Sequence, residues 1–297
     1  MNLNGIICID KPQDFTSFDV IAKLRGILKT RKLGHAGTLD PMATGVLPVF
    51  VGTATKACDI LPESDKIYEA GFLLGKTSDT QDITGKFLSE KSFLGIDKEK
   101  IEDVLNSFRG DIMQIPPMYS AVSVNGHRLY ELARKGIEIE REPRPITVYK
   151  FELLGYDEKT GEGKFLISCS KGTYIRTLIN DVGEVLGCGG IMTSLRRTMA
   201  AGFNISECVT FEELQRTQDF SKYVLPIEKV FEVLPKIMLS EKQTEMYKNG
   251  RRLDTDRIKF DGGNVRYAVF SSDEFLGTAT VDLTAKELKI EKNFYLR

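Results

Sequence analysis

The chain has 297 residues, of which 41% are hydrophobic and 28% are charged, and this composition is that of a globular protein. At about 150 residues per domain, the length predicts roughly two domains. The net charge of -1 argues against a nucleic-acid partner, because phosphate binding generally requires clustered cations. One segment is nevertheless basic: five cations and no acid occur between residues 23 and 35. The five cysteines are scattered without a C-x-x-C pair, which argues against a disulfide framework and a zinc site and favours a reducing cytoplasm.

The chain begins with a short apolar run over residues 6–9, and the charge of Asp10 follows directly. We therefore expect a buried strand here rather than a signal peptide. No apolar run approaches the ~20 residues that cross a bilayer, so no membrane association is expected. Ser17 then predicts the cap of a helix, because apolar residues recur at helical spacing from Val20 to Leu28.

Glycine and polar residues fill the segment 32–45, which separates this basic helix from an apolar strand over residues 46–51. A loop of this kind can hold a carboxylate such as Asp40 beside a ligand. Asp-Pro is also a common turn, and a lone histidine such as His35 is more often a hydrogen-bonded loop residue than a catalyst. These residues alone therefore leave a functional loop and a plain loop both open.

Alternating apolar residues predict a strand around Tyr68, and Asp97 predicts the cap of a second amphipathic helix. The pair Asn125-Gly126 is typical of a tight hairpin turn. Residues 148–156 and 164–169 predict the two strands of a longer hairpin.

Helical spacing starts again at Ile175 and ends at Gly187, which places Arg176 in the first turn of a helix entered from a strand. Lys171 and Tyr174 precede it, so two cations and an aromatic ring gather where helix amides favour anions. The plain alternative is a helix cap with a surface arginine.

The last third of the chain predicts a change of structure. Thr210 opens a capping box, and the charged helical stretch that follows extends to Pro226 and then to Pro235. A domain boundary is expected near Pro235. Beyond it, Ser240 opens a short helix, and strand-like runs follow at residues 265–270, 275–281 and 288–290. The fold class predicted for the whole chain is α+β, with antiparallel hairpins rather than a regular βαβ alternation.

Several motifs together resemble the bacterial tRNA pseudouridine-55 synthase (TruB) family. They occur in the family's order at residues 11–12 with 16–17, 34–41 (Gly-His-Ala-Gly-Thr-Leu-Asp-Pro), 52–56, 116–121, 169–176 and 195–198. More weakly, residues 249–252 resemble the start of the family's C-terminal PUA-type RNA-binding domain.

The resemblance implies a catalytic domain over residues 1–234, with a central, mainly antiparallel sheet flanked by helices and hairpins. It also implies a small β-rich PUA-type domain over residues 235–297. Family members flip uridine 55 out of the T-loop of tRNA and convert it to pseudouridine with a catalytic aspartate. The expected partner is therefore the T-stem-loop of tRNA, with no cofactor, metal or obligate protein partner, and the protein is expected to be a cytoplasmic monomer.

The resemblance also implies roles for individual residues. Asp40 corresponds to the catalytic carboxylate, Tyr68 to the ring on which the flipped uracil stacks, and Arg176 to the arginine that pairs with the aspartate. His35 resembles the residue that takes the place of the flipped base. Tyr174 and Lys171 are expected to shape the pocket, with Lys171 near a phosphate, whereas Lys11 and Pro12 are expected to build the scaffold under the loop.

The chain departs from the family pattern at a few positions. Asp14 stands where a glycine is frequent, Ser123 where a lysine is common, and Gly190-Ile191 where Ala-His is frequent, so the resemblance implies no specific RNA contacts near residues 123 and 191. Two other functions stay open. One is a tRNA-binding or tRNA-folding protein with a non-catalytic pocket. The other is a ribosomal RNA pseudouridine synthase within a guide-RNA complex, which the end of the chain at Arg297 without a basic tail disfavours.

Overall fold

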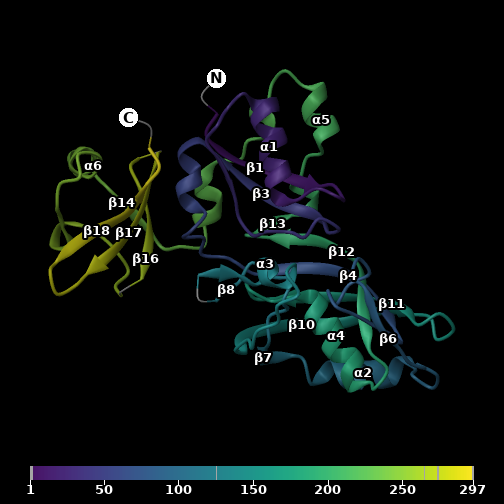
Figure 1. Cartoon of the computed structure of the whole chain (residues 1–297). Helices are drawn as coiled ribbons and strands as arrows, with labels where there is room; N and C mark the ends of the chain where they lie inside the picture. Colours follow the sequence, from purple (N-terminus) through teal and green to yellow (C-terminus); the bar gives the residue numbers. More distant parts are fainter. Residues whose placement is uncertain (1–2, 125, 264, 273, 296–297) are drawn as a thin grey trace. The chain divides into compact units, whose positions relative to one another are not determined.

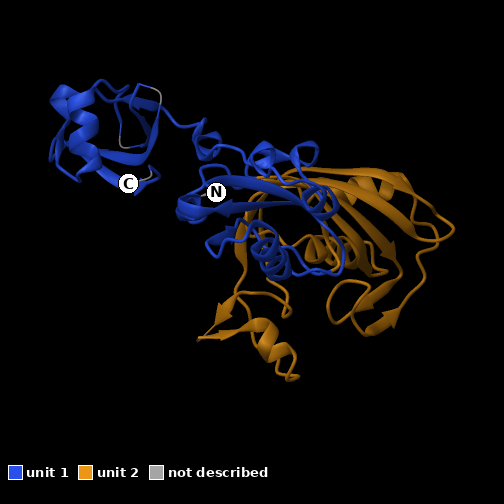
Figure 2. Cartoon of the chain, turned by 90° about the horizontal axis from the view of Figure 1, so that it is seen from above, with its two compact units in different colours: residues 1–41, 46–64, 201–297 blue, residues 42–45, 65–200 orange. Residues whose placement is uncertain are grey.

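The computed structural model describes residues 3–124, 126–263, 265–272 and 274–295. Asn125 of the predicted tight turn and Arg297 at the chain end lie outside these ranges. The chain forms two compact units, shown in different colours in Figure 2. The first contains residues 1–41, 46–64 and 201–297, and the second contains residues 42–45 and 65–200. The domain boundary near residue 235 stays a prediction.

The second unit is built around an antiparallel sheet with the strand order β12-β4-β11-β10-β7 (Figure 1). Helix α4 packs against β12, and α2 packs against β10. The strands are β4 (Lys66–Leu74), β5 (Lys76–Ser78), β6 (Phe87–Glu90), β7 (Gly110–Gln114), β8 (Ser123–Val124), β9 (His127–Arg128), β10 (Arg144–Tyr156), β11 (Glu162–Cys169) and β12 (Gly190–Ala200). The α-helices are α2 (Lys98–Asn106), α3 (Leu129–Ala133) and α4 (Ile175–Val185).

Aromatic side chains form the centre of this sheet's core. The rings of Phe72 and Phe165 stack with centroids 4.1 Å apart, and Phe151 meets Phe165 edge-on at 5.0 Å. All three are almost fully buried. The predicted hairpin is confirmed, because β10 and β11 pair antiparallel across the turn at residues 157–161. This rigid sheet carries Tyr68 on β4 and leads from β11 into α4.

Two separate hydrophobic clusters lie within the described residues of the first unit. Strands β1 and β3 pack with α1 around buried residues such as Ile9, Leu24 and Val49. A separate cluster, which includes Tyr247, Tyr267 and Leu288, lies within residues 237–295. The strands are β1 (Gly5–Lys11), β2 (Leu33–His35), β3 (Thr44–Val51, its first two residues in the second unit), β13 (Phe203–Asn204), β14 (Lys236–Met238), β15 (Leu253–Asp254), β16 (Arg266–Phe270), β17 (Phe275–Asp282) and β18 (Glu287–Asn293). The α-helices are α1 (Ser17–Leu28), α5 (Phe211–Arg216) and α6 (Glu241–Lys248), and the 3-10 helices are η1 (Gly52–Ala57), η2 (Ile205–Glu207), η3 (Ser221–Tyr223), η4 (Ile227–Phe231) and η5 (Thr255–Arg257).

The predicted α+β class is confirmed, and so is the small β-rich C-terminal domain, whose strands run in the order β14-β16-β17-β18-β15. Within the described part of the chain, no helix has the length and apolar character needed to span a bilayer.

Two local predictions were wrong. Thr16, not Ser17, caps α1, because the Thr16 hydroxyl accepts a hydrogen bond from the Asp19 amide while the Asp19 carboxylate accepts one from the Thr16 amide. The helix opened by Thr210 ends at Arg216, and only short 3-10 turns follow it before Pro235.

Candidate active site

The glycine-rich loop begins as a strand and ends at Asp40. Strand β2 pairs antiparallel with β3, which places His35 opposite Val49. The Ala36 amide donates to the Pro48 carbonyl at 3.1 Å, and the chain then turns away from β3. Asp40 is half-buried, so its carboxylate is neither locked into the core nor fully surrounded by water.

Both neighbours of Asp40 are hydrogen-bonded to the segment between β1 and α1. The Leu39 amide donates to the Ser17 hydroxyl at 2.9 Å, and the Pro41 carbonyl accepts from the Asp14 amide at 2.8 Å. Leu39 and Ser17 are both buried. These contacts fix the backbone on each side of Asp40, so the main chain sets the point from which its side chain starts.

Lys11 supplies a third contact to the same loop. Its side chain is fully buried, and its ammonium group donates to the carbonyl oxygens of Phe15 (2.5 Å), Pro12 (2.9 Å) and Pro41 (3.2 Å). A buried ammonium needs such acceptors, because an unsatisfied buried charge is strongly destabilising. The expectation that Lys11 builds the scaffold under the loop is therefore confirmed.

The departure from the family pattern at Asp14 has a simple backbone explanation. Asp14 adopts φ 64°, a left-handed conformation that glycine takes readily and that aspartate tolerates better than most residues. The turn that brings the Asp14 amide to Pro41 is thus kept without glycine.

Tyr68 lies on β4, a strand with neighbours on both sides. It stands opposite Ile167 of β11 and Arg197 of β12, and its side chain is 6% exposed. Two residues earlier on the same strand, burial lowers the pKa of the Lys66 ammonium, and the nearby Arg197 cation lowers it further. Tyr68 is therefore held rigidly, which suits a stacking surface and a core position equally.

The strand-to-helix turn before α4 is tied to a strand further along the sheet. The Tyr174 amide donates to the side-chain oxygen of Gln114 at 2.8 Å, and the Gln114 amide group donates back to the Tyr174 carbonyl at 3.1 Å. Tyr174 is the N-cap residue of α4, and Lys171 is exposed in the preceding turn. Arg176 follows in the first turn of α4, as the sequence predicts.

Arg176 is buried and forms an ion pair that the sequence did not reveal. One guanidinium nitrogen lies 3.3 Å from Asp82 Oδ2, and another donates to the Tyr119 carbonyl at 3.1 Å. The exposed fractions of the Arg176 and Asp82 side chains are 9% and 4%. Buried charges of this kind persist only when they are paired and hydrogen-bonded.

The other carboxylate oxygen of Asp82 is fully engaged by its own loop. Thr80 Oγ1, Thr84 N and Thr84 Oγ1 donate to it at 2.8, 2.9 and 2.6 Å. Asp82 thus presents its second oxygen to Arg176 in one orientation. The signal in the sequence is a threonine two positions before and two after the aspartate, which predicts a side-chain-closed turn but does not name the distant partner.

The predicted site residues belong to two units. His35 and Asp40 lie in the first unit, and Tyr68, Lys171, Tyr174 and Arg176 lie in the second. Asp40 is two residues before the point at which the chain enters the second unit, where Thr44 and Gly45 pair with Arg196 and Arg197. The pairing of Asp40 with Arg176 and the roles of the other residues stay predictions. Across the described ranges, no group of His, Cys, Asp and Glu side chains is arranged to hold a metal ion.

Comparison with known proteins extends over nearly the whole chain. Residues 25–175 match the TruB family pseudouridylate synthase (N terminal domain), and residues 176–232 match the tRNA pseudouridylate synthase B C-terminal domain. The tRNA pseudouridine synthase B of Clostridium kluyveri is 46% identical over 248 residues, which are 84% of this chain and 84% of that protein. The protein of the same name from Clostridium perfringens strain 13 is 42% identical over 296 residues, which are 98% of each chain.

Solved structures of other proteins have a similar fold. A chain in the crystal structure of a Cbf5-Nop10-Gar1 complex superposes with a TM-score of 0.76 at 29% identity, covering 99% of this chain and 85% of that chain. A chain in the archaeal box H/ACA sRNP Nop10-Cbf5 complex gives a TM-score of 0.75 at 26% identity, covering 100% and 88%. The chain belongs to the TruB family of pseudouridylate synthases.

Proposed function

We propose that this tRNA pseudouridine synthase acts on uridine 55 in the T-loop of tRNA, with Asp40 as its catalytic carboxylate. The observation that carries the proposal is the double clamp on the Asp40 loop, in which Leu39 and Pro41 are both fixed while the residue between them stays half-buried. A reaction that depends on one carboxylate needs that group held in place yet open to substrate.

The reaction exchanges one bond to the ribose for another and leaves the oxidation state unchanged. The carboxylate of Asp40 attacks, or stabilises charge on, ribose C1′ or pyrimidine C6, and any bond that it forms breaks again when the product forms. The bond between N1 and C1′ breaks, uracil turns, and C5 bonds to C1′. The proton on C5 leaves and N1 gains a proton, so atoms and charge balance without a cofactor.

The other proposed site residues act on the uridine after it has flipped out of the base stack of the T-loop. This flipping costs a few kcal/mol. Tyr68 offers its ring to the flipped uracil, and His35 occupies the vacated position. Base stacking on an aromatic side chain is worth about 1 to 3 kcal/mol, which offsets much of that cost. Arg176 pairs with Asp40, Tyr174 shapes the pocket, and Lys171 meets a phosphate.

Two alternatives are less well supported. The relatives of this chain at 41–46% identity are named tRNA pseudouridine synthase B, whereas the chains from Cbf5 complexes are only 26–29% identical. This favours tRNA over a guide-RNA complex. A protein that only assists tRNA folding has no need of the clamp on Asp40.

We further propose that the protein works as a monomer and in a reducing cytoplasm. Its five free cysteines suit a reducing compartment.

The direct test is conversion of an unmodified tRNA transcript by the purified protein with nothing else added. The expected result is pseudouridine at position 55 alone, found by mapping modified positions after incubation. Asp40→Asn should bind the transcript with near wild-type affinity and give no product. Asp59→Asn, an exposed acid of the same unit, is the matched control and should react normally.

Three results would overturn parts of the proposal. Absence of product with the wild-type protein removes the activity, and product at another position removes the assignment to the T-loop. Product from Asp40→Asn at the wild-type rate would remove Asp40 from its role while leaving the activity in place.

A further inference from the structure

Strand β7 ends in a buried polar residue. Of its five residues, Gln114 is the one that is buried, with an exposed fraction of 3%, whereas the neighbouring Met113 is 62% exposed. Glutamine is mostly found at protein surfaces and methionine in protein interiors, so the hydrophobic effect alone favours the opposite arrangement of these two residues. Another contribution of Gln114 must therefore offset the cost of its burial.

The side-chain amide of Gln114 contacts one residue at the start of α4 through both of its ends. The amide oxygen accepts from the Tyr174 backbone amide at 2.8 Å, and the amide nitrogen donates to the Tyr174 carbonyl at 3.1 Å. A buried polar group is tolerated when hydrogen bonds replace those lost to water. Because one bond needs the oxygen and the other needs the nitrogen, the pair holds the Gln114 amide in one orientation.

Helix α4 does not begin with a capping box of its own. Within residues 174–185, all of which the structure describes, the N-cap residue Tyr174 makes no side-chain capping bond. In a capping box, a glutamate or glutamine at the third helical position bonds the N-cap amide, but α4 has Thr177 there. The Thr177 hydroxyl donates instead to the side-chain oxygen of Gln81 at 2.7 Å. Gln114, 60 residues away in the sequence, thus supplies the bond to the N-cap amide that a capping box provides locally.

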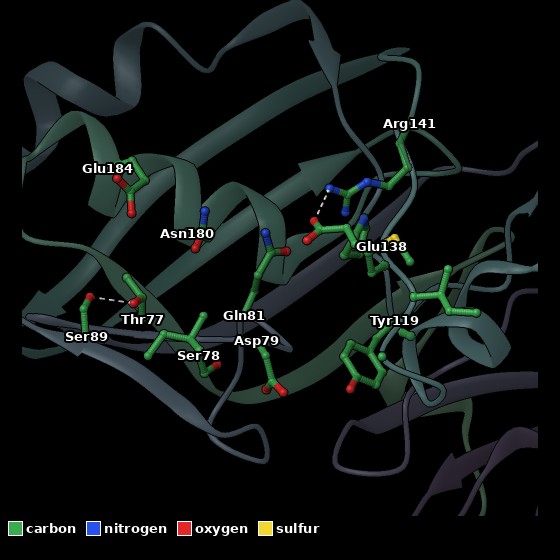
Figure 3. A pocket seen from close by; sticks show the side chains of 16 residues that line it. Thr77, Ser78, Asp79, Gln81, Ser89, Tyr119, Glu138, Arg141, Asn180 and Glu184 are labelled. Atoms are coloured by element: carbon green, nitrogen blue, oxygen red, sulfur yellow. Dashed lines mark hydrogen bonds and ion pairs between the residues drawn. The ribbon is translucent and has the colours of Figure 1, made fainter.

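The segment that follows Gln114 contacts the same helix a second time. The Tyr119 carbonyl accepts from the Arg176 guanidinium at 3.1 Å, while the Tyr119 side chain lines a pocket of about 510 Å³ in this unit (Figure 3). Two consecutive prolines between the two contacts restrict the backbone of the segment. Residues 114–119 therefore hold the start of α4 at Tyr174 and again at Arg176.

Strand β7 is in turn fixed by its neighbour in the sheet. Each of its five residues pairs with β10, and Gln114 stands opposite Arg144. β10 also pairs with β11, the strand that leads into the turn before α4. Both partners of the contact between Gln114 and Tyr174 are thus attached to one sheet. Groups held by strands and by supporting hydrogen bonds are placed more precisely than groups on loops.

We propose that Gln114 is a positioning residue of the pseudouridine synthase reaction, which acts through the backbone of Tyr174 and so sets the first turn of α4 that carries Arg176. The inference rests on the proposed function, in which Tyr174 shapes the pocket and Arg176 pairs with the catalytic carboxylate. Because Gln114 is buried, it acts through these residues and not on the uridine itself. Removal of its hydrogen bonds should lower the rate of the chemical step and leave RNA binding almost unchanged.

Replacement of Gln114 by leucine tests the proposal. Gln114→Leu keeps a side chain of similar size and removes both hydrogen bonds to Tyr174. We expect the single-turnover rate on an unmodified tRNA transcript to fall about 20-fold, because small displacements of groups in an active site lower rates by one to two orders of magnitude. The dissociation constant of the same transcript should change by less than about twofold.

Hydrogen exchange examines the same contact without any reaction. The hydrogen bond to Gln114 protects the Tyr174 amide in the wild-type protein. In Gln114→Leu this amide should exchange at least about tenfold faster, because the start of α4 then opens locally. Mass spectrometry of peptides that cover residues 172–178 gives the exchange rate.

Two variants are the controls for Gln114→Leu. Ile101→Ala truncates a buried residue of α2 in the same unit and should lower the midpoint of urea unfolding. It should nevertheless leave the single-turnover rate and the exchange of the Tyr174 amide within about twofold of wild type. Gln215→Leu makes the same chemical change at an exposed position of α5 and should match the wild type in every measurement.

The outcomes separate this inference from the proposed function. A wild-type rate in Gln114→Leu would overturn the inference, and so would an equal fall in the rate of Ile101→Ala, since stability alone would then explain the effect. A loss of RNA affinity as large as the loss of rate would contradict it too, because Gln114 would then serve binding. Absence of product with the wild-type protein would instead remove the proposed function, and the exchange of the Tyr174 amide would still decide whether Gln114 holds the start of α4.

Discussion

The loop that carries Asp40 and the turn that carries Arg176 are held in different ways. The Asp40 loop is fixed through backbone groups, because the Leu39 amide and the Pro41 carbonyl make the contacts. Arg176 is fixed through its own charge, by a buried carboxylate and a carbonyl oxygen. A backbone clamp constrains where a side chain begins, whereas an ion pair constrains where it ends.

This difference predicts how each region responds to substitution. A backbone clamp tolerates changes at the clamped positions, which is why Asp14 can stand in a left-handed turn where glycine is frequent in the family. An ion pair in a buried setting tolerates little, because removing one partner leaves the other charge uncompensated. The support of Arg176 should therefore be the more sensitive of the two.

Replacement of Asp82 should have the largest effect. In Asp82→Asn the side-chain oxygen can keep the bonds from Thr80 and Thr84, but Arg176 loses the buried charge of Asp82. We expect the single-turnover rate of pseudouridine formation to fall roughly 100-fold, as for the loss of one preorganised charge contact, while RNA affinity changes by less than about threefold. Rapid-quench measurements on a tRNA transcript with saturating protein give the rate.

Asp103→Asn, on the exposed side of α2, is the control for Asp82→Asn and should leave the rate unchanged. A wild-type rate in Asp82→Asn would mean that Arg176 does not depend on this ion pair. The ion pair that holds Arg176 would then be no more sensitive to substitution than the backbone clamp on the Asp40 loop.

Replacement of Lys11 examines the backbone clamp. Lys11→Met keeps most of the buried volume but removes the ammonium donor from the carbonyl oxygens of Pro12 and Phe15, whereas the Pro41 carbonyl keeps its bond from the Asp14 amide. Loss of a buried charged donor of this kind should lower the free energy of unfolding by about 3 kcal/mol, measured by urea denaturation. Lys32→Met, at an exposed position of the same unit, should cost less than about 0.5 kcal/mol. Equal losses in the two variants would show that the buried ammonium is not what holds the loop.

Local interactions explain which parts of the fold could be predicted from the sequence. The caps at Asp97, Thr210 and Ser240 are confirmed, because each joins residues only three positions apart. The strand around Tyr68 and the start of α4 are confirmed through hydrophobic spacing. Thr16 and Ser17 could not be told apart in this way. The Ser17 hydroxyl is taken by Leu39, 22 residues away, and no local pattern contains that contact.

Long-range contacts explain what was missed at the candidate site. The partner of Arg176 is 94 residues away in the sequence, and Asp82 lies in a stretch that looks like an ordinary turn. Gly190, a departure from the family pattern, likewise has a role only in three dimensions. A Cβ atom on Gly183 would stand 2.2 Å from the Gly190 amide nitrogen, so α4 and β12 touch through their backbones at this point. Family resemblance located the residues assigned to the reaction and the scaffold residue Lys11, but not Asp82, which supports Arg176.

The smallest expected effects are changes in the Tm on replacing two acids, Asp19 and Asp181. The fold shifts the pKa values of these two acids from their ordinary values in opposite directions. Hydrogen bonds from the Thr16 hydroxyl and amide lower the pKa of Asp19 at the start of α1, whereas burial raises the pKa of Asp181 on α4. The ionised Asp19 therefore stabilises the fold above about pH 4, the unfolded value, and this contribution is lost as pH falls through the lower folded pKa. The ionised Asp181 is unfavourable, and its penalty appears as pH rises from the unfolded value through the raised folded pKa.

Thermal unfolding from pH 3 to pH 7 separates the two acids. At pH 7, Asp19→Asn should lower the Tm and Asp181→Asn should raise it, each by about 1 to 2 °C, and both differences should shrink toward pH 3. The opposite signs make each variant the control for the other. A stabilising effect of Asp19→Asn, or a destabilising effect of Asp181→Asn, would contradict the assignment of Asp19 to a hydrogen-bonded helix cap and of Asp181 to a partly buried site. The ionised acids of α1, which supports the Asp40 loop, and of α4, which carries Arg176, would then change the stability of the fold in the same direction as the pH falls.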